Sequence, residues 1–454
     1  MRTSSPILSI CIPTWNRAEL LRLFLENLAT EIHGLEDRVE VVVADNASTD
    51  HTAEVVNQSK LTITYGKQPK TVGITNNIFF ATCDLARGEF VWLLGDDDLI
   101  LPGGIERVLD SITRAPDVDY HYINFSWIPV KYRETVLKEM GGNPPEALLR
   151  VRQCDVEEWR RLDRIEDLVF LPGYNPSSLF AGIFCYTVKR AFYDEARLTL
   201  KPSDSLDGSS TVLEDNFPQA MITLPPMAGR PIAYIGKPCM MQGTQGWEWG
   251  AFAYKTLILG NYDLFRWLEK TPFAPDALDK LWESAVKTAG RLYFSMLYYP
   301  DLHKGLDLVQ KEAIPHCSRF PAFWDSLSES AKLVINTEDD AKFVCRLVGM
   351  ASVQSDTSRI GLWGVAGRGH IIVHGYPDIS RRIVWAADSN VLLQGGKLEN
   401  TEVLISLPAT LYDADLDILI LGVKEEHVNE VSALAKHSLK RGAMIVSVTG
   451  IETI

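Results

Sequence analysis

Residues 91–98 read Val-Trp-Leu-Leu-Gly-Asp-Asp-Asp, an apolar strand that leads directly into three consecutive carboxylates. An apolar turn and the start of a helix follow over residues 99–103. Carboxylates at the end of a buried strand repel one another, so we expect a cation beside them. A divalent metal that carries a diphosphate would satisfy this pattern, because hard cations bridge phosphate oxygens to protein carboxylates. The alternative is a solvated acidic turn that caps the helix from Gly103.

Two strands upstream of this stretch also end in polar loops. Residues 7–12 and 39–44 are apolar and rich in β-branched side chains, and a helical pattern follows each of them. This order predicts parallel strands joined by right-handed crossovers, and such sheets bind ligands outside the carboxyl ends of their strands. Each loop residue alone would also suit an ordinary turn or helix cap, so it is their joint placement that favours a binding site. The residues expected at this edge are Thr14, Asn16, Arg17, Asp45, Asn46, Ser48, Asp96, Asp97 and Asp98.

The composition is that of a globular chain with more than one domain. Of its 454 residues, 46% are hydrophobic and 23% charged, and this length exceeds that of one ordinary core. The net charge of −14 argues against a broad nucleic-acid-binding face, because phosphate backbones are held by clustered Lys and Arg. The seven cysteines have no CxxC spacing, and neither a leader segment nor an apolar run of membrane-spanning length is seen. We therefore expect reduced thiols and a cytoplasmic location, with peripheral contact at the inner face of the membrane as an option.

Three motifs carry a resemblance to a known family. They read Ser-Ile-Cys-Ile-Pro-Thr-Trp-Asn-Arg at 9–17, Val-Val-Val-Ala-Asp-Asn-Ala-Ser-Thr-Asp at 41–50, and Ala-Arg-Gly-Glu-Phe-Val-Trp-Leu-Leu-Gly-Asp-Asp-Asp at 86–98. In this order they resemble the family 2 glycosyltransferases of the GT-A fold. The Gly-Asp-Asp-Asp ending, with Leu-Pro-Gly-Gly-Ile behind it at 101–105, is similar to the abequosyltransferase-like bacterial branch of that family.

The resemblance implies a nucleotide-sugar site with Mn²⁺ or Mg²⁺ as cofactor. Asp97 and Asp98 would be the metal ligands, although Gly95 stands where many relatives carry the first aspartate. Two registers therefore remain open, Asp96 with Asp98 or Asp97 alone. The residues implied along the nucleotide sugar are Pro13, Thr14, Asn16, Arg17, Asp45, Asn46, Ser48 and Asp96.

The acceptor side is expected in the second half of the same domain. A charged helix is predicted near residues 156–168, an apolar strand over 177–190, and a closing strand over 232–238. Between the last two, Glu214 and Asp215 open a helix, and in the resembled family such a pair supplies the general base. We expect Asp215 to be the base and Glu214 to be its substitute, since an inverting transfer needs a carboxylate that takes the acceptor hydroxyl's proton. The alternative is a pair of first-turn acids that stabilise the helix dipole.

The remaining chain shows less chemistry. A loop after residue 242 carries Trp247 and Trp249, which could stack on a sugar, touch the membrane surface or pack on the next helix. Residues 251–355 are helical by pattern and could form an oligomer surface. Strand-helix alternation resumes over 356–454, where Gly364, Gly367 and Gly369 lie 19 or more residues before Asp388; this glycine spacing is not the dinucleotide-binding fingerprint.

The predicted protein therefore has an α/β fold in three parts. Residues 1–250 form a GT-A nucleotide-diphospho-sugar transferase domain, 251–355 a helical connecting region, and 356–454 a small Rossmann-like domain. The predicted function is inverting, metal-dependent transfer of a sugar from a nucleoside-diphosphate donor to a glycan or lipid-linked acceptor, in bacterial surface polysaccharide synthesis. The alternative is a sugar-nucleotide modifying enzyme that uses a cofactor in the C-terminal domain.

Overall fold

The computed structural model of the chain describes residues 5–139, 141–149, 152–174, 182–203, 213–244, 253–298, 304–332, 340, 343–348, 357–366, 368–390, 393–399 and 401–454. These residues form two units, 1–285 and 286–454. The boundary falls inside one helix, α11 (Pro275–Tyr298). The predicted division at residues 250 and 355 stays a prediction.

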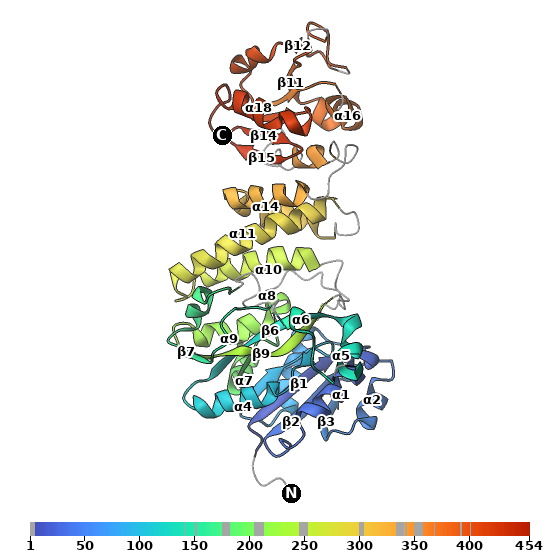
Figure 1. Cartoon of the computed structure of the whole chain (residues 1–454), viewed down its shortest axis with the longest axis vertical. Coiled ribbons are helices and arrows are strands. Elements are labelled where there is room, and N and C mark those ends of the chain that lie inside the picture. Colours follow the sequence, from blue (N-terminus) through green and yellow to red (C-terminus); the bar gives the residue numbers. More distant parts are fainter. Residues whose placement is uncertain are drawn as a thin grey trace. The chain divides into compact units, whose positions relative to one another are not determined.

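The first unit is built on a sheet whose first four strands are parallel, as predicted. Their order is β3-β2-β1-β4, and Figure 1 labels the first three of these strands. β1 and β2 are buried on both faces because helices cover the sheet. Each of the first three strands leads into a helix, so the polar loops lie between a strand's carboxyl end and a helix start. The elements are β1 (Leu8–Thr14), α1 (Ala18–Glu31), β2 (Val39–Asp45), α2 (Thr52–Gln58), β3 (Ile63–Lys67), α3 (Ile74–Phe79), the π-helix η1 (Phe80–Leu85) and β4 (Phe90–Leu93).

The second half of this unit extends the same sheet. Its strands continue in the order β8-β6-β9-β5, with β7 also paired to β9. β8 runs antiparallel to both β4 and β6, whereas β6 and β9 are parallel. The elements are β5 (Leu99–Ile100), α4 (Gly104–Arg114), β6 (Tyr120–Pro129), η2 (Val130–Tyr132), α5 (Arg133–Glu139), α6 (Glu146–Leu149), β7 (Arg160–Leu162), η3 (Ile165–Phe170), β8 (Tyr186–Lys189), α7 (Ala191–Thr199), α8 (Leu213–Asn216), α9 (Pro218–Met227) and β9 (Ile232–Thr244).

One predicted element in this half is wrong. The charged helix expected near 156–168 is instead the strand β7 followed by the 3₁₀ helix η3. β7 adds to the outside of β9, where Arg160 and Arg161 remain exposed. Charged side chains are common on such an edge strand, because they discourage pairing with further chains. The predicted strands over 177–190 and from 232 are present as β8 and β9, although residues 177–181 lie outside the described part.

The middle of the chain is helical where it is described, as predicted. Apolar side chains such as Phe265 and Trp282 pack edge to face, with ring centroids 5.4 Å apart. Further along, Gly290 lies against the backbone of Phe323, which allows α11 and α14 to approach closely. The helices are α10 (Ala253–Leu268), α11, α12 (Leu306–Glu312), α13 (Ile314–Cys317) and α14 (Pro321–Lys332).

The C-terminal residues form a second sheet with strand order β12-β11-β10-β13-β14-β15. Its first five strands are parallel and β15 is antiparallel. The predicted strand-helix alternation is present, and the order β12-β11-β10-β13-β14 is that of a doubly wound sheet. The elements are β10 (Ile360–Trp363), α16 (Arg368–Gly375), α17 (Pro377–Ser380), β11 (Ile383–Ala387), β12 (Ile405–Ser406), η7 (Pro408–Asp413), β13 (Ile418–Leu421), α18 (Glu425–Lys436), β14 (Met444–Ser447) and β15 (Gly450–Thr453).

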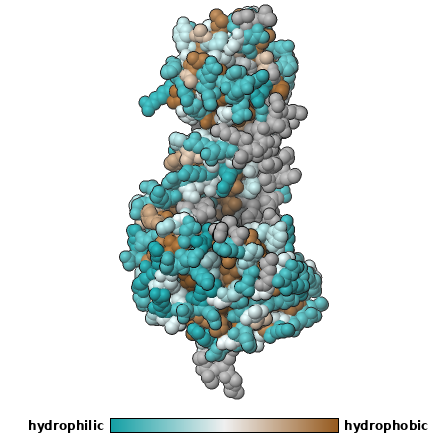
Figure 2. All heavy atoms as spheres, in the orientation of Figure 1, coloured by the Kyte–Doolittle hydropathy of each residue, from teal (hydrophilic) through white to brown (hydrophobic). Residues whose placement is uncertain are grey.

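The surface is mainly hydrophilic on the face that Figure 2 shows, with apolar residues scattered over it. Large exposed apolar side chains such as Leu198 and Tyr412 occur singly along the chain. Among the described residues, no helix combines the length and the apolar character needed to cross a membrane. All seven cysteines are thiols and not disulfides.

Candidate nucleotide-sugar site

The polar loops after β1 and β4 meet at the carboxyl edge of the first sheet. Thr14, at the end of β1, donates a hydrogen bond from Oγ1 to Asp96 Oδ2 at 2.7 Å. Arg17 forms two ion pairs, from Nη1 to Asp96 Oδ1 at 2.9 Å and from Nη2 to Asp97 Oδ2 at 2.8 Å. Residues more than 75 positions apart in sequence are thereby joined in one polar cluster. Because β1 lies between β2 and β4, the loop after β2 borders the same cluster.

The three aspartates differ in their surroundings. Asp96 is buried, and burial raises the pKa of its carboxyl to about 6 against the opposing effect of Arg17. Asp98 is also buried, its oxygens accept hydrogen bonds from the Gly95 N–H at 2.7 Å and the Gly243 N–H at 3.2 Å, and burial raises its pKa well above the usual range. Asp97 is the most accessible of the three, with 14% of its side chain exposed. Asp97 is therefore the carboxylate best placed to meet a ligand.

Gly95 leaves room for the carboxylates that follow it in this turn. A Cβ atom at this position would lie 2.7 Å from Asp97 Oδ1 and 3.3 Å from Asp98 Oδ2. The first contact is shorter than Cβ atoms tolerate, so a side chain at residue 95 would displace the Asp97 carboxylate. Gly95 stands where many members of the resembled family carry an aspartate. In this chain the absence of a side chain leaves space for the Asp97 carboxylate.

A second guanidinium, that of Arg133, is buried beneath the cluster and was missed by sequence reasoning. Arg133 opens α5 and donates from Nη2 to the Asp96 carbonyl at 3.2 Å and to the Leu20 carbonyl at 3.4 Å. Burial lowers its pKa, whereas the nearby aspartates raise it. Its Nε and Nη1 have no hydrogen-bond partner in the described structure. Two guanidiniums and three carboxylates therefore lie together in this cluster.

The loop after β2 is fixed by its own polar side chains. Asp45 is fully buried, and its Oδ1 accepts from the Ser48 N–H while its Oδ2 accepts from the Tyr65 hydroxyl, both at 2.7 Å. Burial and this carboxylate together raise the pKa of Tyr65. Asn46 forms two hydrogen bonds with the backbone of Val72, at 2.8 and 2.9 Å. The predicted residues Asp45, Asn46 and Ser48 therefore shape the rim of the site.

The loops after β1 and β2 are also hydrogen-bonded to each other. The Asn16 N–H donates to Ser48 Oγ at 2.8 Å, and Asn16 Oδ1 accepts from the Thr49 N–H at 2.7 Å. Asn16 and Ala47 have φ angles of 53° and 61°, conformations that L-residues adopt at a cost and that cluster at functional sites. Pro13 is buried in β1 beneath these loops. The two loops thus form one connected surface.

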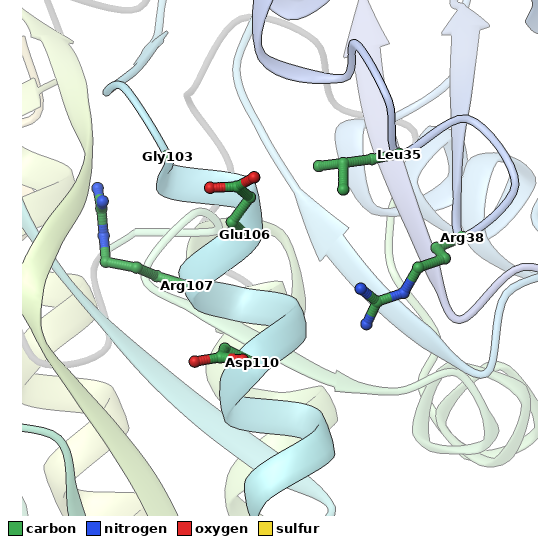
Figure 3. Close-up of a pocket in the computed structure, with 6 residues that line it drawn as sticks. All are labelled: Leu35, Arg38, Gly103, Glu106, Arg107 and Asp110. Atoms are coloured by element: carbon green, nitrogen blue, oxygen red, sulfur yellow. The ribbon is translucent and has the colours of Figure 1, made fainter.

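Two hollows lie on this unit. One, of about 310 Å³, is lined by residues of the β1–α1 and β2–α2 loops, including Asn16, Arg17 and Asp50. The other, of about 410 Å³, is lined by Glu106, Arg107 and Asp110 of α4 and, opposite them, Leu35 and Arg38 (Figure 3). Leu35 and Arg38 precede β2, so this second hollow includes the amino end of a parallel strand and contains none of the predicted site residues. The first hollow adjoins the cluster through Arg17, but none of the three aspartates lines it.

The acidic pair lies on the short helix α8. Asp215 accepts a hydrogen bond from the Ser203 N–H at 2.9 Å and another from the Ser203 hydroxyl. The Glu214 carbonyl accepts from Thr75 Oγ1 at 2.7 Å. Thr75 is in α3, which follows β3, so this bond attaches α8 to the first half of the unit.

In the second unit, Asp388 follows β11 at the place where a dinucleotide-binding fold carries its ribose-binding acid. Here its two oxygens accept from the Val365 N–H at 2.9 Å and the Asn390 N–H at 2.8 Å. Gly369 is packed against the carbonyl of Gly364. These glycine and aspartate positions therefore serve contacts within the protein. Gly367, Trp247 and Trp249 lie outside the described residues.

Comparison with known proteins agrees with the three motifs. The family described as Glycosyl transferase family 2 matches residues 9–156, which confirms the resemblance for that region. Abequosyltransferase RfbV of Salmonella typhimurium is 36% identical over 115 residues, 23% of this chain and 33% of that protein. GalNAc(5)-diNAcBac-PP-undecaprenol beta-1,3-glucosyltransferase of Campylobacter jejuni is 32% identical over 115 residues, 23% of this chain and 34% of that protein. The chain thus spans about a third of the length of these relatives. A solved structure of S. aureus TarS with UDP-GlcNAc covers 77% of this chain and 82% of its own, at 14% identity and a TM-score of 0.43.

Proposed function

We propose that this chain is an inverting, metal-dependent glycosyltransferase, because residues 9–156 belong to glycosyl transferase family 2. It moves a sugar from a nucleoside-diphosphate donor to a glycan or lipid-linked acceptor, in the synthesis of a bacterial surface polysaccharide at the cytoplasmic face of the membrane. The observation that carries this proposal is the cluster in which Arg17 joins Asp96 and Asp97 at the carboxyl edge of the sheet. Such an edge is where open α/β sheets bind nucleotides.

The donor set at this edge fits Mn²⁺ or Mg²⁺. Both ions prefer oxygen ligands and bind through one or two carboxylates together with substrate phosphates. In our proposal Asp97 is the principal ligand, because it is the most accessible carboxylate, and Asp96 lies beside it on the same guanidinium. The sequence led us to expect Asp98 as the second ligand. Its carboxylate accepts hydrogen bonds from the Gly95 and Gly243 N–H groups, and it would thereby hold the turn that carries Asp97. The bound ion would supply charge stabilisation for the departing diphosphate.

The protein's own residues would bind and orient the donor. Arg17 pairs with two aspartates here, and its exposed side would turn toward a phosphate once a cation neutralises those carboxylates. The hydrogen bond from the Tyr65 hydroxyl to Asp45 fixes both side chains, and the base or ribose would bind beside this pair. Asn16, Asn46 and Ser48 would hold the rim in a single shape, which reduces the ordering that binding requires.

The general base in this proposal is Asp215, with Glu214 as its substitute. An acceptor hydroxyl attacks the anomeric carbon from the side opposite the diphosphate, and a carboxylate must accept its proton. The Thr75 hydrogen bond supports this placement, because it attaches α8 to the half of the sheet that would bind the donor. The Ser203 hydroxyl and N–H orient the Asp215 carboxylate.

The experiment that tests the proposed function compares Asp97→Asn with Asp110→Asn, an exposed aspartate on α4. We expect one nucleoside diphosphate with Mn²⁺ to raise the melting temperature of the wild type and of Asp110→Asn but not of Asp97→Asn, because the carboxamide lacks the charge that holds the metal. Release of nucleoside diphosphate from the corresponding sugar donor should follow the same pattern. Wild-type binding and turnover by a folded Asp97→Asn protein would contradict the proposal.

A further inference from the structure

Two histidines and a glutamate of the second unit bring their ligand atoms together at the surface. His370 and His374 lie on α16, and Glu399 lies in the segment before β12. One nitrogen of each imidazole and one oxygen of Glu399 all lie within 4.8 Å of one another. We propose that these three residues form a binding site for a divalent transition-metal ion of the Zn²⁺ type, separate from the nucleotide-sugar site.

The geometry of the trio is close to that of a coordination sphere. His370 and His374 are four residues apart, so they lie on the same face of α16, and their ring centroids are 4.3 Å apart. Glu399 Oε2 lies 3.6 Å from His370 Nδ1 and also contacts His374 Nε2. Ligand atoms around tetrahedral zinc are about 3.3 Å apart, given bonds of about 2.0 to 2.1 Å. A small inward rotation of the side chains would therefore place all three atoms on one ion.

An ordinary surface ion pair explains the trio less well. Exposed pairs contribute little to stability, and a pair needs one histidine only. When both imidazoles carry a proton, two positive rings in contact repel each other, and only one carboxylate offsets them. A metal ion instead uses two neutral imidazoles and one carboxylate together.

The basic residues nearest in sequence are occupied by other partners. Arg368 contacts Asp340 and donates to the Val423 carbonyl at 2.8 Å. Lys397 pairs with Glu402. Neither positive charge is directed at the trio in this structure, so the carboxylate of Glu399 is shared by the two histidines.

The ligand set indicates the kind of metal and its effect. Imidazole and carboxylate ligands favour zinc, nickel and copper over magnesium and calcium. The trio is exposed, so the remaining coordination positions would hold water. Because Glu399 is 25 residues from His374 in sequence, the ion would tie α16 to the segment before β12. Metal binding should therefore stabilise the second unit.

The test is a titration of the metal-free full chain with Zn²⁺ in the presence of excess Mg²⁺, which occupies oxygen-only sites. We expect one Zn²⁺ per chain by calorimetry and an increased melting temperature. His370→Ala, His374→Ala and Glu399→Ala should each weaken Zn²⁺ binding by roughly 100-fold or more, since loss of even a residue that only supports a ligand weakens metal binding about 10- to 100-fold. His427→Ala, an exposed histidine on α18 that lies beside Glu426, is the matched control.

Zinc-edge X-ray absorption of the loaded protein distinguishes this site from any other. We expect two imidazole nitrogens in the coordination shell of the wild type and one in His374→Ala. Unchanged Zn²⁺ affinity in all three alanine variants, or a shell without imidazole, would overturn the proposal. All three side chains are exposed, so the variants should fold, and equal melting temperatures without metal would verify this. None of these readouts depends on sugar transfer.

Discussion

Among single residues, Arg17 has the most direct effect on the acidic site, because its guanidinium contacts two of the three aspartates. Arg17→Gln should lower the stability of the metal-free protein by about 3 kcal/mol, since it leaves a buried carboxylate without its partner. Mn²⁺ should then raise the melting temperature of Arg17→Gln more than that of the wild type, because the competing cation is gone. Thermal unfolding with and without Mn²⁺ measures both effects.

Arg22→Gln provides the comparison for Arg17→Gln. Arg22 lies on the same helix and pairs with Glu19 and Glu26 at the surface, so its loss should change stability by less than about 1 kcal/mol. An Arg17→Gln protein as stable as Arg22→Gln, with the wild-type response to Mn²⁺, would show that the aspartates do not depend on this cation.

The acidic pair supports a second prediction at this scale. Asp215→Asn should reduce turnover about 10²- to 10⁴-fold, the usual contribution of a positioned general base. Donor affinity should stay within a few fold, because this carboxylate would act on the acceptor. Steady-state kinetics with saturating donor, beside Asp194→Asn of α7 as a control, measures the difference. If Glu214→Gln is the inactive variant, the two roles are exchanged; if both variants are active, the base lies elsewhere.

The two arginines show how far the sequence could predict the site. Arg17 follows a strand and belongs to a motif, so its place at the sheet edge could be expected. Arg133 lies in the polar sequence Lys-Tyr-Arg-Glu at 131–134, which is typical of an exposed helix. It is buried only because α5 packs beside α1 and over the aspartate turn. That burial depends on tertiary packing, which no local pattern specifies.

Among the elements, β6 was the largest omission. Its sequence Tyr-His-Tyr-Ile-Asn-Phe-Ser-Trp at 120–127 has polar side chains at 121, 124 and 126, so it is neither continuously apolar nor strictly alternating. In the fold β6 lies between β8 and β9 and both faces are covered. Asn124 is satisfied internally, because it donates to the Cys154 and Gly236 carbonyls. Ser126 Oγ and His121 Nε2, by contrast, are buried without a hydrogen-bond partner among the described residues. The strands β1, β2 and β4 were predictable because they are largely apolar, as buried parallel strands are.

β6 also makes stability depend on pH. His121 is buried, its Nδ1 lies 2.9 Å from Ser111 Oγ, and that oxygen accepts from the Trp159 indole N–H. Burial lowers the pKa of His121 to about 4. A lowered histidine pKa means that acid favours the unfolded chain, so stability is lost as pH falls from about 6.5 toward 4.

We therefore expect the wild type to lose roughly 2 kcal/mol between about pH 7.5 and 5 through His121. Over the same pH range, the free energy of unfolding of His121→Gln should fall by roughly 2 kcal/mol less than that of the wild type, whatever its stability at neutral pH. Urea unfolding at both pH values, followed by tryptophan fluorescence, gives the comparison. His33→Gln, at a surface histidine, should keep the wild-type dependence. If the stability of His121→Gln falls with pH as steeply as that of the wild type, groups other than His121 control acid unfolding.

At the scale of the whole molecule, the two units divide the proposed activities. All residues of the proposed transfer site are in 1–285, whereas the histidine–glutamate trio is in 286–454. Within the second unit, α14 packs on β15, where a Cβ at Gly450 would lie 1.6 Å from Ser328 Oγ. Gly450 also has a φ of 130°, which L-residues rarely adopt. The second unit can therefore be destabilised by a single methyl group.

Gly450→Ala should destabilise the second unit by about 1 to 3 kcal/mol through overpacking. Binding of nucleoside diphosphate with Mn²⁺ should remain within a few fold of wild type, because every residue proposed for it precedes residue 100. Limited proteolysis and a binding titration on the same sample test both statements. Gly442 also has a positive φ, but no atom lies near the position of its Cβ. Gly442→Ala is therefore the control that separates backbone strain from steric collision. Loss of binding in Gly450→Ala alone would show that the units act together.

The turn at Gly95 restricts how this protein can evolve. Since a Cβ there would collide with Asp97, a mutation at residue 95 is tolerated only after the carboxylate at 97 has moved or shortened. The two positions are therefore expected to change as a pair in descendants of this sequence. An aspartate introduced at residue 95, to give the commoner spacing, would therefore need a compensating shift of Asp97.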